Sequence, residues 1–268
     1  MTLVFRNSRI RLAPGQIFWR EVGQEGRPIV FLHGGEHDSS QWLPLLEKLG
    51  QNNRGFAPDL LGFGDSEYPK VHHSIQLQVE CLAAYLDALR LESVYLVGHS
   101  LGAWIAASYA LQNRDRVAGL ILISPLGVRE NSDRKHWRTE RSLLNPLTPL
   151  ILKILAPFAK VIGKNRHLKA LSQRRAELRQ FPTFCQLLLR RRATEISAEL
   201  LDNRLEFLQT PVLILQGAQE HPNQIAASQT YAKLATDAKF SLISQGDRDL
   251  PTQMPDLVAR EIATFWAN

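Results

Sequence analysis

Short runs rich in valine, isoleucine and leucine alternate with segments of helical periodicity along most of this 268-residue chain. We predict strands at 29–32, 55–58, 94–97, 120–124, 212–216 and 240–243, with helices at 40–49, 75–89, 101–111, 223–234 and 255–265. Strands that are apolar throughout, such as 120–123, are typical of sheets covered on both faces. The alternation therefore predicts an α/β fold with a mostly parallel central sheet flanked by helices. Two earlier runs, 3–12 and 16–22, predict an antiparallel hairpin.

The alternation stops in the middle of the chain, where prolines, arginines and helical spacing replace the strand pattern. We predict an α/β core at 1–127 and 210–268, and a helical cap inserted at 128–209. Residues 129–204 contain 17 Lys and Arg against 7 Asp and Glu, whereas the rest of the chain contains 15 against 19. The cap alone therefore makes the protein basic, with a net charge of +6.

A G-x-S-x-G motif, Gly98-His99-Ser100-Leu101-Gly102, lies between the predicted strand 94–97 and an alanine-rich helix. A chance match is the alternative, but the strand before the motif and the helix after it indicate a nucleophile elbow. Such a turn exposes the serine hydroxyl, and backbone N–H groups of the following helix, beginning with Leu101, can stabilise an oxyanion.

The segment His33-Gly34-Gly35 follows the predicted strand 29–32, where a second oxyanion donor is needed. We predict that the N–H group of Gly35 completes an oxyanion hole with that of Leu101. His33, Gly34 and His99 are predicted to contribute to substrate binding. The alternative is an ordinary turn in which His33 only satisfies local hydrogen bonds.

Four sequence blocks together resemble the α/β-hydrolase superfamily, in particular its capped esterases, C–C bond hydrolases and haloalkane dehalogenases. They are His33-Gly34-Gly35 with Ser39-Ser40-Gln41-Trp42, the run Asp59-Leu60-Leu61-Gly62-Phe63-Gly64-Asp65-Ser66, the Ser100 elbow, and Pro211-Val212-Leu213-Ile214-Leu215-Gln216-Gly217 with Glu220. The resemblance implies that Ser100 is a nucleophile and that the block 59–66 is a structural loop. The alternative for this glycine-rich turn is phosphate binding, but no helix with a phosphate-binding lysine follows it.

The resemblance also implies a triad acid at Glu220, three residues after Gly217, and a histidine near the C-terminus. The last 47 residues contain no histidine. Counting back seven residues from Pro255 gives Arg248, and alignment on the nearer Pro251 gives Asp249 as the alternative. Arginine cannot accept the serine proton, and aspartate is a far weaker base than imidazole. The base of the triad is therefore missing.

Other histidines are poor replacements for this base. His99 lies inside the elbow and is expected to point away from the hydroxyl, while His33 belongs to the opposite loop. His221, next to the predicted acid, is the best candidate. His72 and His73 are expected in a surface loop. His136 and His167 belong to the cap and could lie over the site, but nothing in the sequence would orient them.

Two functions fit this pattern. One is a serine hydrolase that acts on an ester or related acyl substrate, with activity impaired by Arg248. The other is a non-catalytic ligand-binding or regulatory protein that uses the pocket under the cap, with Arg248 paired to an anionic ligand or to Glu220. Fold alone cannot decide between them.

Composition limits the partners. Cys81 and Cys185 fit neither a disulfide framework nor a metal site, so we expect a protein without cofactor or metal. The sequence shows neither a signal peptide nor an apolar run long enough to span a bilayer, so we expect the protein in the cytoplasm. The apolar stretch 147–162 beside a basic segment favours a lipophilic or anionic substrate, or transient contact with an anionic membrane surface. The alternative is that this stretch simply packs on the core. No nucleic-acid partner is expected, and the sequence leaves substrate identity and oligomeric state open.

Overall fold

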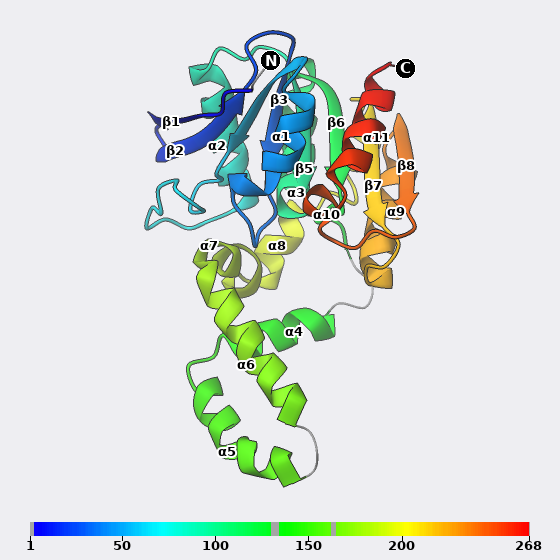
Figure 1. The fold of residues 1–268 in the computed structure, drawn as a ribbon. Coiled ribbons are helices and arrows are strands. Elements are labelled where there is room, and N and C mark those ends of the chain that lie inside the picture. The colour runs from blue at the N-terminus through cyan, green and yellow to red at the C-terminus, as the bar shows by residue number, and fades with distance from the viewer. Residues whose placement is uncertain (1–2, 130–133, 162–164, 268) are drawn as a thin grey trace.

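An eight-stranded sheet forms the centre of the protein in a computed structural model that describes residues 3–129, 134–161 and 165–267 (Figure 1). Its strands are β1 (Arg6–Arg11), β2 (Gln16–Val22), β3 (Arg27–Leu32), β4 (Asn53–Pro58), β5 (Val94–His99), β6 (Val117–Ile123), β7 (Val212–Gly217) and β8 (Ala238–Ile243). They are ordered β1-β2-β4-β3-β5-β6-β7-β8. Strands β1 and β2 form an antiparallel hairpin, and β2 pairs antiparallel with β4. The other neighbouring pairs, from β4 through β3 and onward to β8 in sheet order, are parallel.

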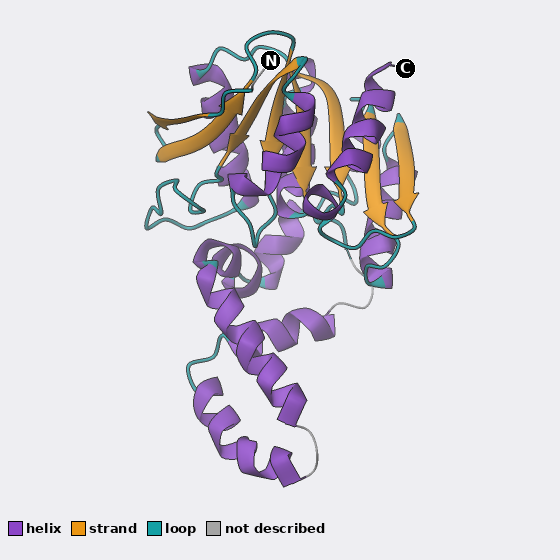
Figure 2. Ribbon diagram, viewed as in Figure 1, coloured by secondary structure: helices purple, strands orange, loops and turns teal. Residues whose placement is uncertain are grey.

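Helices cover both faces of this sheet (Figure 2). The core helices and short 3-10 turns are η1 (Ser39–Trp42), α1 (Leu43–Leu49), α2 (Ile75–Ala88), α3 (Leu101–Gln112), η2 (Arg114–Arg116), α9 (Pro222–Leu234), α10 (Leu250–Gln253) and α11 (Pro255–Ala267). Residues of α1 and α11 pack with Phe31 and Val97 on one face, while α2, α3 and α9 pack with Leu96 and Leu120 on the other. The predicted α/β fold is therefore confirmed. The one-turn helix α10 was not predicted, because one turn is too short to give a periodic pattern.

All described elements between β6 and β7 are helical. They are α4 (Arg134–Leu143), α5 (Thr148–Val161), α6 (Asn165–Gln180), α7 (Pro182–Phe184), a π-helical turn η3 (Cys185–Arg190), α8 (Ala193–Glu199) and a 3-10 turn η4 (Leu205–Phe207). Helices α5 and α6 project away from the sheet (Figure 1). We call the helices from α4 to α8 the helical segment; its division from the core at 128 and 209 stays a prediction.

Two further sequence expectations concern cysteines and membrane spans. Cys81 and Cys185 are free and buried, and burial raises the pKa of the two thiols to about 12 and about 11 respectively. A thiol with such a raised pKa is largely unreactive. Among the described residues, no helix combines the length and the apolar content needed to cross a bilayer.

Arg174 on α6 joins the helical segment to the core. Its guanidinium contacts Glu36, in the loop after β3, with Nη1–Oε2 at 2.5 Å and Nη2–Oε1 at 2.9 Å. The same group donates from Nε to Glu140 on α4 at 2.7 Å. Burial alone would raise the pKa of Glu36, but the hydrogen bonds and the charge of Arg174 outweigh it, so the pKa lies below its ordinary value. One arginine thus forms ion pairs with two largely buried carboxylates.

We expect Arg174→Met to lower the free energy of unfolding at pH 7 by about 1–3 kcal/mol. Removing one member of a buried ion pair leaves the carboxylates without their cation, and the partial exposure of Arg174 reduces the cost of that loss. In the variant, burial raises the pKa of Glu36. Its carboxylate is therefore protonated more readily than in the wild type, which removes the unpaired charge. The difference in the free energy of unfolding between wild type and variant consequently narrows as the pH falls toward 4. Urea unfolding at several pH values measures this.

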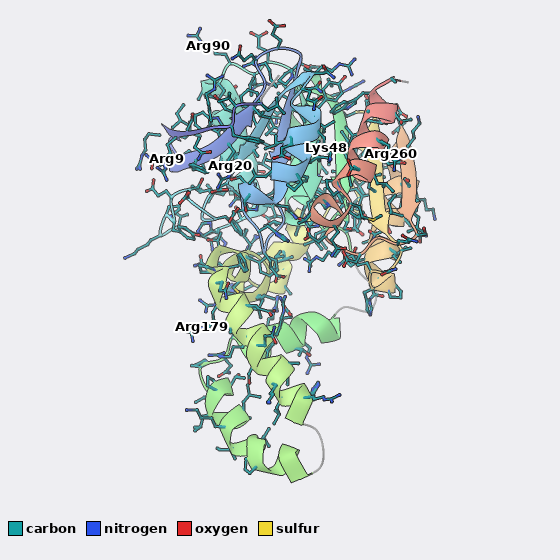
Figure 3. All side chains as sticks on the ribbon, in the orientation of Figure 1. Arg9, Arg20, Lys48, Arg90, Arg179 and Arg260 are labelled. Atoms are coloured by element: carbon teal, nitrogen blue, oxygen red, sulfur yellow. The ribbon has the colours of Figure 1, made fainter. Side chains whose placement is uncertain are left out.

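Arg179→Met on the same helix is the control, because Arg179 is exposed and projects from α6 (Figure 3). It is expected to change stability by less than about 0.5 kcal/mol. Equal effects of the two substitutions, or a difference that does not depend on pH, would contradict the role given to Arg174.

Candidate active site

Ser100 occupies the turn between the end of β5 and the start of α3. Its backbone has φ 52° and ψ −109°, a left-handed conformation that is strained for any residue other than glycine. The N–H group of Ser100 donates to the carbonyl of Ile123 at 2.9 Å, and its own carbonyl accepts from Trp104 and Leu126 at 3.2 Å. The surrounding strands and helix therefore hold the strained turn, with the side chain almost fully buried.

Two glycines allow this turn to pack closely. A Cβ atom at Gly102 would lie 2.1 Å from the carbonyl oxygen of Leu32, at the end of β3. A Cβ atom at Gly98 would lie 2.5 Å from the Cα of Ala103. Because the obstructing atoms belong to the backbone, neither contact can be relieved by a side-chain rotation. The glycines of the motif are thus required by the approach of α3 to the sheet.

Arg248 reaches the hydroxyl of Ser100 from the loop between β8 and α10. Its Nη2 donates to Ser100 Oγ at 3.2 Å, and its Nη1 lies 3.8 Å from Oε1 of Glu36. The serine oxygen is therefore an acceptor in this contact. A guanidinium group has no acceptor, so Arg248 cannot take the serine proton. Of the two residues predicted at the triad histidine position, Arg248 is the one that contacts Ser100.

Asp249, the alternative at this position, is engaged elsewhere. Its Oδ1 accepts hydrogen bonds from Nε2 of Gln41 and from Oγ1 of Thr252, both at 3.0 Å. The carboxylate thus serves the packing of the loop against η1 and α10.

Glu220, the predicted triad acid, lies in the turn after β7. Its Oε2 accepts a hydrogen bond from Nε2 of Gln216 at 2.7 Å, and Gln216 is fixed in turn by Ser228. Burial raises the pKa of Glu220, and the hydrogen bond from Gln216, followed by smaller effects that include the positive charge of Arg248, opposes that shift only in part. The carboxylate is therefore oriented by a neutral amide, and Arg248 is close enough to influence its ionisation.

His99 and His33 are both almost completely buried, with both ring nitrogens engaged by the protein. His99 donates from Nε2 to the carbonyl of Arg248 at 2.9 Å and accepts at Nδ1 from Gln41 at 2.9 Å. His33 donates from Nδ1 to the carbonyl of Gly34 at 2.8 Å and accepts at Nε2 from Leu60 N–H at 2.9 Å. Burial lowers the pKa of both rings, which are therefore neutral near pH 7.

These contacts alter the expectation for the three predicted substrate-binding residues. Gly34 N–H also donates within the protein, to Oε1 of Gln41 at 3.1 Å. His33, Gly34 and His99 thus hold the loops around Ser100 together, and the structure does not support direct polar contacts from them to a substrate. Gln41, which bonds Gly34, His99 and Asp249, was missed as an organising residue because its partners are far apart in the sequence.

The predicted oxyanion donors lie on two elements that meet near the elbow. Leu101 is the first residue of α3, where backbone N–H groups have no partner within the helix. Gly35 follows β3, and a Cβ atom there would lie 2.2 Å from the ring of Phe184 in α7. The helical segment therefore packs directly over the loop that carries Gly35. The role of both N–H groups as an oxyanion hole stays a prediction.

The remaining histidines do not supply a base in the contacts described. His221 accepts from the N–H of Asn223 at 3.3 Å and caps α9. His72 lies 3.4 Å from Glu195, His73 is buried, and His167 is exposed on α6. The side chain of His136 lies outside the described residues.

His37 was missed by the sequence analysis, although its position two residues after Gly35 could have pointed to it. Its ring centroid lies 5.7 Å from that of His99. Ligand atoms of His37, His99 and Asp249 lie within 4.8 Å of one another, so these three could geometrically approach a metal ion. Burial lowers the pKa of His37, the negative charge of Asp249 opposes this shift, and the nearby positive charge of Arg248 adds to it. Both ring nitrogens of His99 are already hydrogen-bonded within the protein. The arrangement therefore does not favour a cation.

Substitution of Gly102 tests the packing of the elbow. We expect Gly102→Ala to lower the free energy of unfolding by at least about 2 kcal/mol, because the methyl group meets the backbone of β3. Gly119→Ala is the control, since the atoms nearest to a Cβ there belong to side chains, the half-buried ring of Tyr95 at 2.9 Å and the ring of Phe265 at 3.8 Å; we expect a smaller loss, of about 1 kcal/mol. Urea unfolding followed by circular dichroism measures both, and a Gly102→Ala protein as stable as the wild type would contradict this packing.

Comparison with known proteins places the chain in a family. A family model described as the alpha/beta hydrolase fold matches residues 27–250. The 1-acylglycerol-3-phosphate O-acyltransferase ABHD5 of Rattus norvegicus is 32% identical over 171 residues, which cover 58% of this chain and 49% of that protein. The 2-hydroxy-6-oxo-2,4-heptadienoate hydrolase of Pseudomonas putida is 36% identical over 107 residues, which cover 38% and 39%. The chain thus spans less than half the length of these curated relatives.

Solved structures extend the match to nearly the whole chain. The crystal structure of a bacterial membrane phospholipase A aligns with a TM-score of 0.77 and 21% identity, covering 98% of this chain and 86% of that one. This likeness concerns the fold. Because the family model covers most of the sequence, the chain belongs to the alpha/beta hydrolase fold family.

Proposed function

We propose that this protein is a serine hydrolase of the α/β-hydrolase type in which Ser100 is the nucleophile and Arg248 replaces the triad histidine. The observation that carries this proposal is the hydrogen bond from Arg248 Nη2 to Ser100 Oγ at 3.2 Å. It puts a permanent donor where catalysis needs an acceptor. Turnover is accordingly impaired, by the factor of about 10²–10⁴ that general-base catalysis typically contributes.

The rest of the proposed machinery is retained. Ser100 would attack an acyl carbonyl, and the N–H groups of Leu101 and Gly35 would stabilise the resulting oxyanion. The strained backbone at Ser100 supports this proposal, because such strain is typically kept at functional sites. Glu220 would orient an imidazole if one stood at position 248. Without it, the carboxylate is held by Gln216.

The proposed substrate is an ester or related acyl compound with a lipophilic or anionic portion. The side chain of Arg248 is 46% exposed and is only loosely paired with Glu36, at 3.8 Å. The planar N–H groups of its guanidinium match a carboxylate or a phosphate. The curated relative ABHD5 is named for an acylglycerol phosphate, which combines an acyl ester with such an anion. We therefore favour acyl esters that carry a negative charge near the ester.

A second candidate is a non-catalytic ligand-binding or regulatory protein. Two contacts favour it: Arg248 already occupies the hydroxyl of Ser100, and Glu220 is satisfied by Gln216. In this case Arg248 would bind the anionic group of a ligand that is not turned over.

A fluorophosphonate probe distinguishes the two candidates. We expect slow labelling of the wild-type protein and at least about ten-fold faster labelling of Arg248→His, because imidazole can accept the proton of Ser100. Ser100→Ala should abolish labelling in both backgrounds. Mass spectrometry of the intact protein gives the extent and the rate.

Arg248→Lys is the matched control, since it keeps the charge and supplies no base at neutral pH. It should label no faster than the wild type. If Arg248→His is folded, as judged by its thermal melting, and is still not labelled, the hydrolase proposal fails and the ligand-binding candidate is favoured.

A further inference from the structure

Helix α5 presents an apolar face to solvent. Four exposed side chains of α5 and that of Leu147, the residue just before the helix, form what we call the α5 apolar face: Leu147 (61% exposed), Leu150 (58%), Ile151 (50%), Ile154 (58%) and Leu155 (45%). Their spacing of three and four residues places them on one side of the helix. They are half of the ten large hydrophobic side chains that are exposed in the described part of the chain. Such a concentration on one helix marks a contact surface.

The location of α5 leaves this face accessible. The helix lies at the end of the helical segment that is farthest from the sheet, and it packs beside α6 (Figure 1). Leu152 and Pro149 turn inward and line a hollow of about 430 Å³ between the two helices, together with Leu168 of α6. The helix therefore uses one side for α6 and exposes the other. The alternative that this stretch packs on the core is wrong for the α5 apolar face.

The surroundings of the α5 apolar face are strongly basic. Between Glu140 and Glu177 the sequence contains eight Lys and Arg and neither Asp nor Glu. Both flanking glutamates lie against Arg174, at 2.7 and 3.6 Å, so they are already paired with a cation. Lys153, Lys169 and Arg175 line the hollow beneath α5. A partner of this surface should therefore be apolar and negatively charged at once.

We propose that α5 docks on a bilayer that contains anionic phospholipid. The α5 apolar face would enter the boundary between headgroups and acyl chains. Lys153 and Lys169 start beside the hollow between α5 and α6, but both are exposed, and their long side chains would extend toward the lipid phosphates. The helix would lie along the surface, since its 14 residues are too few to cross the hydrocarbon core. A second copy of the chain is a poorer partner, because two copies related by a twofold axis would bring like charges together.

This proposal does not rest on catalysis by Ser100, because binding to lipid is measured without turnover. Failure of the labelling experiment would leave it intact, and failure of lipid binding would leave the proposed hydrolase chemistry intact.

Co-sedimentation of the full chain with vesicles tests the docking. We expect binding to vesicles of phosphatidylcholine and phosphatidylglycerol to be at least about ten-fold stronger than to phosphatidylcholine alone, since each basic residue near the surface adds to the attraction. Leu150→Asp/Ile154→Asp should weaken binding at least about ten-fold by placing charge on the inserted face. Lys153→Ala/Lys169→Ala should weaken binding only to the vesicles that contain phosphatidylglycerol.

Phe207→Asp is the control, because this side chain is 67% exposed on η4, outside the α5 apolar face. It should bind like the wild type. The proposal is overturned if the wild type binds equally to the two vesicle types, or if Leu150→Asp/Ile154→Asp binds as well as Phe207→Asp. It is also overturned if neither the wild type nor any variant binds vesicles, while ultracentrifugation shows a dimer that only Leu150→Asp/Ile154→Asp disrupts.

Discussion

The left-handed backbone of Ser100 is the constraint around which the rest of the site is arranged. It persists because the N–H group of Ser100 is bound to β6 and its carbonyl to the chain beyond β6 and to α3. Gly102 allows α3 to approach the end of β3 so closely that no side chain fits between them. The loop that carries Gly35 begins at the same point. Packing of one helix against one strand therefore determines where the hydroxyl and the proposed oxyanion donors meet.

Charge links this elbow to the helical segment. Arg248 contacts Ser100 and lies near Glu36, Glu36 is bound by Arg174, and Arg174 also binds Glu140 on α4. Alternating charges thus run from the proposed nucleophile to the helices above it. A neutral histidine at position 248 would leave Glu36 with Arg174 as its only close cation in the described contacts. The arginine therefore affects both the chemistry of Ser100 and the electrostatics of the adjoining loop.

Most of the core could be predicted from sequence, because its signals are local. Buried strands such as β6 and β7 are continuous apolar runs, and the last helix, α11, shows a clear helical period. Ser100 and Arg248 could be found because a motif and a fixed spacing mark them. Gln41 and Arg174 could not, since their importance comes from contacts with residues at distant positions in the sequence. The roles of His33 and His99 were also hidden, because only the structure shows that both ring nitrogens are occupied.

The pH dependence of ester hydrolysis by the wild type and by Arg248→His tests most directly whether only the base is missing. If only the base is missing, kcat/KM of Arg248→His above pH 7 exceeds that of the wild type by a factor of about 10²–10⁴. The kcat/KM of this variant then rises with pH through a step near pH 6.5, the ordinary pKa of imidazole. The wild type shows no such step. A wild-type profile that already contains an imidazole step of the same height would contradict the account, because another histidine would then be serving as the base for Ser100.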